Sequence, residues 1–389
     1  MIDRAAHPRE TRDTVVIRFA GDSGDGMQLT GSQFTLETAL SGNDLATFPD
    51  FPAEIRAPAG TTFGVSSFQI RFGTGEVLTA GDELDVLVAM NPAALKVELK
   101  SLRAGGTVVV DTDAFTERNL LKAGYAKNPL DGQDLAPYRV LPLDIAKLTH
   151  LAVEPFGLTA RESTRCRNMW ALGLMLWMYG REKEASVKWL EKKFAKEPNL
   201  AKANVAALNA GHAFGETAEM PSHVVGYTVP KAHVPPGTYR TVMGAEALSW
   251  GLVAGMQAAG IPRMVFGSYP ITPASPILHT LAKLKAYGVV TFQAEDEIAA
   301  ICSAIGAAYA GSLGVTSSSG PGVALKGEAL GLAISAELPL VLVNSQRAGP
   351  STGMPTKTEQ SDLYQSVYGR NADSPLAVIS CSTPHDCFD

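Results

Sequence analysis

Residues 292–311 have the sequence FQAEDEIAAICSAIGAAYAG, three consecutive acids followed by a run of small and apolar residues. The larger side chains of this run recur at helical spacing, which predicts a tightly packed, buried helix. They are Ile298, Ile301, Cys302, Ile305 and Tyr309. Glu297 then lies on the first turn, after Glu295 and Asp296. Acids at a helix start cap it and complement its dipole, so capping is the first interpretation for all three.

Strands and helices alternate on both sides of this helix. Apolar runs typical of buried parallel strands occupy residues 264–268, 289–293, 314–318 and 339–344, and Ala- and Gly-rich helical stretches separate them. Open α/β sheets bind ligands at the carboxyl ends of their strands. Three such ends carry Thr272, the turn at 317–320 and Arg347, and Glu297 follows a fourth. We therefore expect these residues along one edge of one sheet.

The first 150 residues alternate in the same way. Apolar runs at 14–19, 85–90 and 106–111 predict strands. In the second half of residues 50–72 apolar and polar residues alternate, which predicts a strand pair or strand edge. Arg56 lies on a predicted loop there, either as a surface arginine or as a contact to an anion or a neighbouring subunit. Trp170, Leu174 and Trp177 at helical spacing indicate core packing rather than a cofactor site.

Periodicity fades at 216–240, where prolines and polar residues indicate a linker. We therefore expect an α/β domain at 1–215 and a second one at 241–389.

A glycine-rich turn follows the first strand, from Gly21 to Gly31. Strand, glycine turn and helix together present backbone amides to a phosphate, so Gly21, Ser23, Gly24 and Gly26 are candidates for a phosphate or coenzyme A loop. The spacing is neither the dinucleotide fingerprint nor a Walker A loop. A tight packing turn between strand and helix explains these glycines equally well.

Composition excludes several classes of protein. The 389 residues carry a formal net charge of −6 without a basic stripe, which argues against nucleic acid binding. The four cysteines are scattered, which argues against a metal or cluster site in this chain and for a reducing, cytoplasmic location. The longest apolar run, 169–179, is too short to span a bilayer, so we expect no membrane association.

Four motifs in the second half resemble one enzyme family. They are YPITPASPI at 269–277, the acidic helix start at 293–311, TSSSGPG at 316–322 and QRAGPSTGMPT at 346–356. In this order they resemble the pyrimidine-binding domain of the 2-oxoacid:ferredoxin oxidoreductases, which use thiamine diphosphate. The first half resembles the family's gamma module, although Asp22, Ser23 and Asp25 replace residues of its usual Gly-Gly-Gln-Gly loop. The resemblance implies a gamma-type α/β domain followed by a transketolase-like α/β domain with a mainly parallel sheet.

The resemblance also implies roles for single residues. Glu297 matches the glutamate that hydrogen-bonds N1′ of the aminopyrimidine, and Thr272 matches a threonine near the reacting carbon. Arg347 matches the arginine that binds the 2-oxoacid carboxylate, and Lys357 and Thr358 are candidates for a second carboxylate. A turn hydroxyl and a surface ion pair remain the alternatives for Thr272 and Arg347. The remaining candidates for cofactor contact are Tyr269, Pro270, Ile271, Ser318, Ser319 and Gly320.

The implied activity is the coenzyme A-dependent oxidative decarboxylation of 2-oxoglutarate to succinyl-CoA and CO2, with reduction of ferredoxin. A beta subunit is implied as well, with Mg2+ and a [4Fe-4S] cluster, in an (αβ)2 assembly. The same chemistry on pyruvate, branched-chain or aryl 2-oxoacids is an alternative, and so is a non-catalytic assembly subunit. Residues 376–380 are predicted to form a strand shortly before Asp389, and family members usually continue with another α/β domain, so we expect more chain after Asp389.

Overall fold

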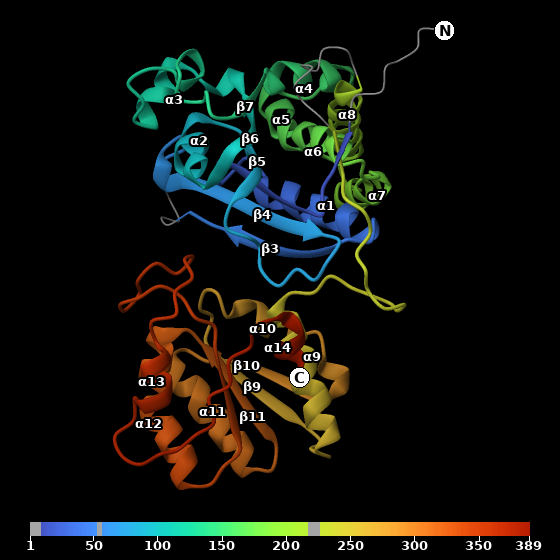
Figure 1. Ribbon diagram of the computed structural model, residues 1–389. Helices are drawn as coiled ribbons and strands as arrows, with labels where there is room; N and C mark the ends of the chain where they lie inside the picture. The colour runs from blue at the N-terminus through green and yellow to red at the C-terminus, as the bar shows by residue number, and fades with distance from the viewer. Residues whose placement is uncertain (1–8, 53–56, 217–225) are drawn as a thin grey trace. The chain divides into compact units, whose positions relative to one another are not determined.

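The computed structural model describes residues 9–52, 57–216 and 226–389, and Arg56 lies outside these ranges. The chain divides into two compact units, residues 1–240 and 241–389 (Figure 1). Within the expected linker, β8 (Gly226–Thr228) pairs in parallel with β1 (Arg9–Thr11) in the first unit. In the described ranges no helix has the length and apolar character needed to cross a bilayer.

The first unit contains a six-stranded mixed sheet in the order β3-β4-β2-β5-β6-β7. Its strands are β2 (Thr14–Asp22), β3 (Asp44–Asp50), β4 (Val65–Gly73), β5 (Leu84–Ala89), β6 (Leu102–Asp111) and β7 (Arg139–Leu143). The ladders of β4 with β3 and β2 are antiparallel, and the others are parallel. The predicted parallel strands at 85–90 and 106–111 are thereby confirmed. After the end of β3, the described part of residues 50–72 contributes a single strand, β4, which lies inside the sheet between β3 and β2, so the predicted strand pair or strand edge is wrong.

Helices cover both faces of this sheet (Figure 1). One face is packed by α1 (Met27–Leu40), α4 (Ile145–Val153), α6 (Arg167–Met178) and α8 (Pro198–Gly215), with α5 (Ala160–Arg165) and α7 (Glu184–Lys193) beside them. The other carries α2 (Pro92–Glu98) and α3 (Glu117–Lys122). Trp170, Leu174 and Trp177 are buried in the first layer, which confirms their core role. Glycine lets α6 and α8 approach closely, because a Cβ on Gly211 would lie 1.9 Å from the Trp170 carbonyl oxygen.

The second unit contains a four-stranded sheet in the order β10-β9-β11-β12, with every ladder parallel. Its strands are β9 (Met264–Ser268), β10 (Val289–Gln293), β11 (Leu313–Ser318) and β12 (Leu340–Asn344). Its helices are α9 (Gly244–Ala258), α10 (Ser275–Leu281), α11 (Glu297–Tyr309), α12 (Gly320–Ser335), α13 (Leu363–Tyr368) and α14 (Pro384–Phe388). The predicted parallel α/β domain is confirmed.

The prediction of a buried helix at α11 is wrong for part of its apolar pattern, because several of these apolar residues are exposed. Ile301 and Ile305 are buried, but Ile298 is 50% exposed and Tyr309 83% exposed, and Cys302 is also exposed. The helix packs on the sheet through a narrow stripe of small residues, because Gly314 on β11 brings the strand against it. A Cβ on Gly314 would lie 2.2 Å from the Ala304 carbonyl oxygen. The other half of the apolar pattern therefore faces outward in this chain.

The strand predicted at 376–380 is also absent. Among the residues that the structure describes, these have no strand partner, and β12 remains the edge of the sheet. The chain instead leads to α14, which packs on α9. Gly251 allows that contact, since a Cβ there would lie 2.0 Å from the Phe388 carbonyl oxygen. An apolar run of strand-forming residues thus does not form a strand of the sheet unless another strand is available to pair with it.

Candidate functional site

The carboxyl ends of β9, β11 and β12 meet at the backbone carbonyl of Thr272. Arg347 Nη1, after β12, donates to this oxygen at 2.9 Å. Ser319 Oγ, after β11, lies 3.2 Å from the same oxygen and 2.6 Å from the Ser345 carbonyl. The prediction that these strand ends share one edge is confirmed.

Arg347 is nearly buried, with 8% of its surface exposed, so it is not a surface ion pair. Its Nε is buried and has no hydrogen-bond partner in the described ranges. A guanidinium has five N–H donors, so it retains several for a ligand after bonding Thr272. Arg347 and Gly320 also line a cavity of about 700 Å³. The arrangement suits a planar anion such as a carboxylate.

Asp362 is part of this edge, although no sequence motif points to it. Its carboxylate accepts from Asn344 Nδ2 at 2.6 Å and from Gln346 Nε2. A Cβ on Gly320 would lie 3.1 Å from Asp362 Oδ2. In the sequence Asp362 is an acid directly before a short helix, which suggests capping, yet its side chain caps nothing there.

Capping at the start of α11 is done by Asp296 rather than by Glu297. Asp296 Oδ1 accepts from the Ala299 amide at 2.7 Å. The half-buried Glu297 side chain packs instead against Gly322 at the start of α12. A Cβ on Gly322 would lie 2.8 Å from Glu297 Cγ and 1.9 Å from Ser318 Oγ. Glycine at this position thus allows Glu297 and Ser318 to lie side by side.

Several buried polar atoms around this edge have no hydrogen-bond partner in the described part of the chain. They are Ser317 Oγ, Ser318 Oγ, Asn344 Oδ1 and Arg347 Nε. An unsatisfied buried polar group costs about 1–3 kcal/mol, so a ligand with both donors and acceptors is favoured there. An aminopyrimidine ring has both, and together with the Glu297 carboxylate the atoms present fit such a ring.

The remaining predicted residues lie on the loops around this edge. Tyr269 and Ile271 are half-buried on the loop after β9, and Pro270 is exposed, as is Thr272. Lys357 is half-buried and Thr358 exposed on the loop after β12. The Lys357 carbonyl accepts from the Ala348 amide at 2.8 Å, which ties this loop to the residue after Arg347.

Lys326 is a buried cation that the sequence interpretation missed. It is fully buried on α12, and its Nζ donates to Thr316 Oγ1 at 2.7 Å. Burial lowers the pKa of Lys326 to about 8, against the opposing attraction of Glu297 and Asp296. A lysine within the apolar pattern of a predicted buried helix was the available signal.

In the glycine loop of the first unit, a carboxylate of the loop itself accepts a hydrogen bond from the loop's backbone. Asp25 Oδ2 accepts from the Asp22 amide at 2.8 Å, and Gly26 has a positive φ of 76° at the start of α1. Arg167 Nη1 donates to the buried Asp111 at 2.9 Å, and burial raises the pKa of that carboxyl to about 6. Ser23 and Gly24 are exposed. A phosphate or coenzyme A role for Gly21, Ser23, Gly24 and Gly26 stays a prediction.

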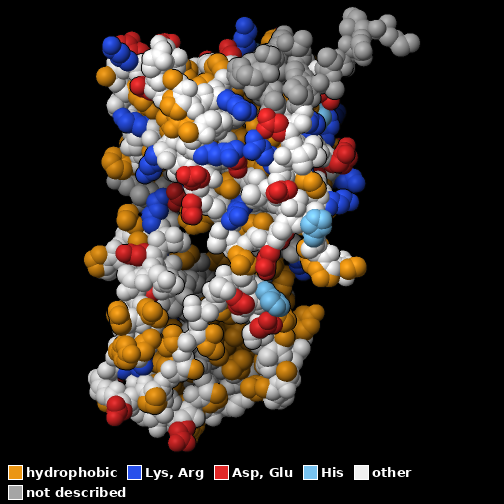
Figure 2. All heavy atoms as spheres, viewed as in Figure 1, with side chains coloured by type: hydrophobic (Ala, Val, Ile, Leu, Met, Phe, Trp, Pro, Cys, Tyr) orange, Lys and Arg blue, Asp and Glu red, His pale blue; other side chains and the backbone are white. Residues whose placement is uncertain are grey.

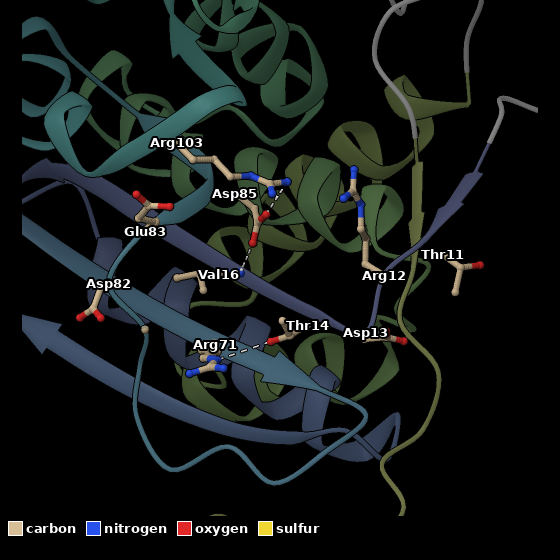
Figure 3. A pocket seen from close by; sticks show the side chains of 11 residues that line it. Thr11, Arg12, Asp13, Thr14, Val16, Arg71, Asp82, Glu83, Asp85 and Arg103 are labelled. Carbon is tan, nitrogen blue, oxygen red and sulfur yellow. Dashed lines mark hydrogen bonds and ion pairs between the residues drawn. The ribbon is translucent and has the colours of Figure 1, made fainter.

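A second cavity, of about 750 Å³, lies at the amino ends of β2, β5 and β6 (Figure 3). Its charged side chains largely balance. They are Arg12, Arg71, Arg103, Asp13, Asp82, Glu83 and Asp85. Arg103 pairs with Asp85 at 2.6 Å, and Asp85 accepts from the Val16 amide at 2.7 Å. These internal contacts, at the edge opposite to the usual ligand side, indicate structural use. Among the described residues, no three His, Cys, Asp or Glu side chains are placed so that they could together hold a metal ion.

Comparison with known proteins agrees with this geometry. Residues 255–389 match the family model described as pyruvate flavodoxin/ferredoxin oxidoreductase, thiamine diphosphate-binding. Residues 16–214, a little more than half of the chain, match the model described as pyruvate ferredoxin/flavodoxin oxidoreductase.

Individual relatives extend the likeness over nearly all of the chain. The 2-oxoglutarate oxidoreductase subunit KorA of Mycobacterium tuberculosis is 58% identical over 99% of this chain and 58% of its own length. A 2-oxoacid:ferredoxin oxidoreductase alpha subunit of Aeropyrum pernix is 30% identical over 78% of this chain and 52% of its own. The chain thus spans little more than half the length of these curated relatives.

A solved structure shows the same fold. It is the 2-oxoglutarate:ferredoxin oxidoreductase from Magnetococcus marinus with 2-oxoglutarate, coenzyme A and succinyl-CoA bound. It superposes with a TM-score of 0.76 and 30% identity, over 97% of this chain and 60% of the other. On these matches and this fold, the chain belongs to the pyruvate ferredoxin/flavodoxin oxidoreductase family.

Proposed function

We propose that this chain is a subunit of a 2-oxoglutarate:ferredoxin oxidoreductase, which converts 2-oxoglutarate and coenzyme A to succinyl-CoA and CO2 and reduces ferredoxin. The observation that carries the proposal is the sheet edge that places Glu297 beside Ser318 and Arg347 on the Thr272 carbonyl, within the segment that matches the thiamine diphosphate-binding model. The alternative is the same reaction on pyruvate, branched-chain or aryl 2-oxoacids.

The cofactor would be held by the carboxylate and hydroxyls beside Gly322. Glu297 would hydrogen-bond N1′ of the aminopyrimidine, and Ser318, Ser319, Gly320 and residues 269–271 would provide further contacts to the cofactor. Thiamine diphosphate, when bound, supplies the carbon nucleophile and the electron sink for decarboxylation. This chain's part is to orient the ring and to exchange a proton at N1′ through Glu297.

The substrate would lie between two cationic side chains. Arg347 offers donors for the carboxylate next to the 2-oxo group, and Thr272 would hydrogen-bond near the reacting carbon. Lys357 and Thr358, on the loop joined to Ala348, would bind a second carboxylate. A second cation is of use only to a dicarboxylate, which favours 2-oxoglutarate over pyruvate.

The rest of the active site would come from a beta subunit, with Mg2+ and a [4Fe-4S] cluster, in a cytoplasmic (αβ)2 assembly. Large apolar side chains are exposed on the second unit, and few charged ones accompany them (Figure 2). They include Ile298 and Tyr309 on α11, Leu325 and Leu332 on α12, and Tyr364 and Tyr368 on α13. Exposed apolar surface on this scale is typical of a protein interface.

The experiment is an assay of the chain purified with its beta subunit. Coenzyme A-dependent reduction of a viologen dye is measured with a panel of 2-oxoacids, including 2-oxoglutarate, pyruvate, branched-chain and aryl acids. We expect the highest kcat/KM with 2-oxoglutarate. Higher kcat/KM with another acid would reassign the substrate, and no turnover with any acid would reject the enzymatic proposal in favour of an assembly role.

A further inference from the structure

Lys326 is unusual because its charge is buried and it forms no ion pair with the residues that the structure describes. The side chain is fully buried, and its one hydrogen bond in the described ranges goes to the neutral hydroxyl of Thr316. Fully buried lysines are rare, and an ammonium removed from water costs several kcal/mol unless nearby groups compensate. A methionine or leucine would fill the same space without this cost. The position therefore requires an explanation other than packing.

The residues around Lys326 place it near Glu297. Lys326 is one helical turn after Gly322 on α12, so both face the same side, and Gly322 is the residue against which Glu297 packs. Ile301 on α11 and Ala329 on α12 belong to the apolar cluster that fills the space between the helices, which keeps water out. The ammonium lies in the layer between α11, α12 and β11.

The charged groups that act on this ammonium all lie on one element. Glu297 and Asp296, at the start of α11, favour its charged form, and Cys302 on the same helix contributes in the same direction. Asp296 is already engaged as the helix cap. The facing side chain from β11 is the neutral Thr316. Glu297 is thus the carboxylate for which the buried cation is available.

We propose that Lys326 is a positioning residue for Glu297. Its ammonium, tethered to Thr316, is a fixed counter-charge that holds the Glu297 side chain against Gly322 and Ser318, in the place where the cofactor ring is received. The contact itself is independent of any ligand, and only its catalytic consequence rests on the proposed function. Lys326 touches neither substrate nor cofactor in this assignment.

The first test needs no cofactor. Amide hydrogen exchange of α11 and α12 is measured by mass spectrometry in the full-length chain for Lys326→Met, Glu297→Gln and the double variant, because this method reports local stability. At pH 7 we expect Glu297→Gln to accelerate exchange several-fold in the wild-type background and much less in the Lys326→Met background. At about pH 9.5, where Lys326 with its pKa of about 8 is neutral, this difference should disappear.

Additive effects at pH 7, or an interaction that persists unchanged at the higher pH, would overturn the proposal. Thr316→Val is the matched control, since it removes the hydrogen bond and keeps the charge, and the interaction should survive it. If Lys326→Met does not fold, Lys326→Gln completes the same cycle with a polar side chain.

The second test uses the enzyme assembled with its beta subunit. Exchange of the C2 proton of bound thiamine diphosphate is followed against pH. We expect the exchange rate of the wild-type enzyme to fall as pH rises through about 8. The rate of Lys326→Met should be lower at pH 7 and should not show this fall. An identical profile in both enzymes rejects the positioning role. If the amide exchange effects of the two substitutions are non-additive but the wild-type enzyme shows no C2 proton exchange, the interaction of Lys326 with Glu297 is kept and the proposed function is rejected.

Discussion

Two adjacent acids, Asp296 and Glu297, have different roles because of where the helix begins. Asp296 stands before the first turn, and its carboxylate accepts from the Ala299 amide. Glu297 stands inside the turn, and its side chain packs against Gly322. Since Asp296 caps the helix, Glu297 remains available for the proposed contact with the cofactor ring. This division of roles gives the first prediction.

Glu297→Gln should slow C2 proton exchange of bound thiamine diphosphate by about a hundredfold or more, because an amide cannot exchange a proton at N1′. The measurement is exchange into deuterated buffer followed by acid quench of the assembled enzyme. The matched control is Glu295→Gln, which removes a neighbouring exposed acid and should leave the rate near that of the wild type. Near-normal exchange in Glu297→Gln would show that another carboxylate does this work.

Lys326 should make the stability of the chain depend on pH in a defined direction. Burial lowers its pKa from 10.5 to about 8, so between these values the folded chain has released a proton that the unfolded chain still binds. The free energy of unfolding therefore rises as pH rises from about 8 to 10.5, by roughly 3 kcal/mol at most. Urea unfolding at several pH values checks this rise, which Lys326→Met should lack.

The positions of residues could be predicted from the sequence where they lie in motifs at strand ends. Thr272, Ser319 and Arg347 were placed on one edge before the fold was known, because parallel strands end together. Lys326 and Asp362 could not be found in this way. The environment of Lys326 depends on which helix covers it, and that of Asp362 depends on which strand ends its loop packs against. The spacing of neighbouring residues in the sequence predicts neither.

At the scale of elements, the start of α12 packs closely against both α11 and β11 at Gly322. Gly322→Ala should destabilise the second unit by about 1–3 kcal/mol and displace Glu297, because the added methyl would overlap Ser318 and Glu297. Gly331→Ala, in the same helix, has nothing within 4 Å of the new Cβ and should stabilise by about 0.5–1 kcal/mol. Urea unfolding of both variants measures the contrast, and equal effects would contradict it.

Element types were predicted well where periodicity was long and its neighbours lay close in sequence. The strands β9 to β12 and the helices between them form consecutive parallel units, so local patterns suffice. The errors arose where packing depends on other chain segments. The apolar pattern of α11 covers more of the helix than the sheet buries, and residues 376–380 have no adjacent strand to pair with.

At the scale of the whole molecule, the exposed apolar side chains of the second unit are the feature that sequence alone did not reveal. A hydrophobic residue in a helix is assigned to the core by its spacing, whether the covering surface belongs to the same chain or to another. Ile298 and Tyr309 match the helical pattern of Ile301 and Ile305, yet they are exposed.

Ile298→Lys should therefore weaken assembly with the beta subunit by tenfold or more in Kd, roughly the 1.4 kcal/mol expected from burying one charge in an apolar interface. The chain itself should remain folded, because Ile298 is 50% exposed. Titration of the purified subunits, read by viologen reduction, measures the change. The control, Leu151→Lys on α4 in the first unit, should lower assembly much less.

The carbonyl of Thr272 has a consequence for engineering this family. One oxygen atom receives Arg347 and lies beside Ser319, so loops from three strands are held to a single point. A graft of the loop after β9 from a relative of different acid preference displaces the oxygen that the other two loops contact, and a graft of either other loop removes one of the two side chains that contact it. Specificity exchanged between relatives should therefore require all three loops to be transplanted together, and chimeras with one or two should lose activity before they gain a new substrate.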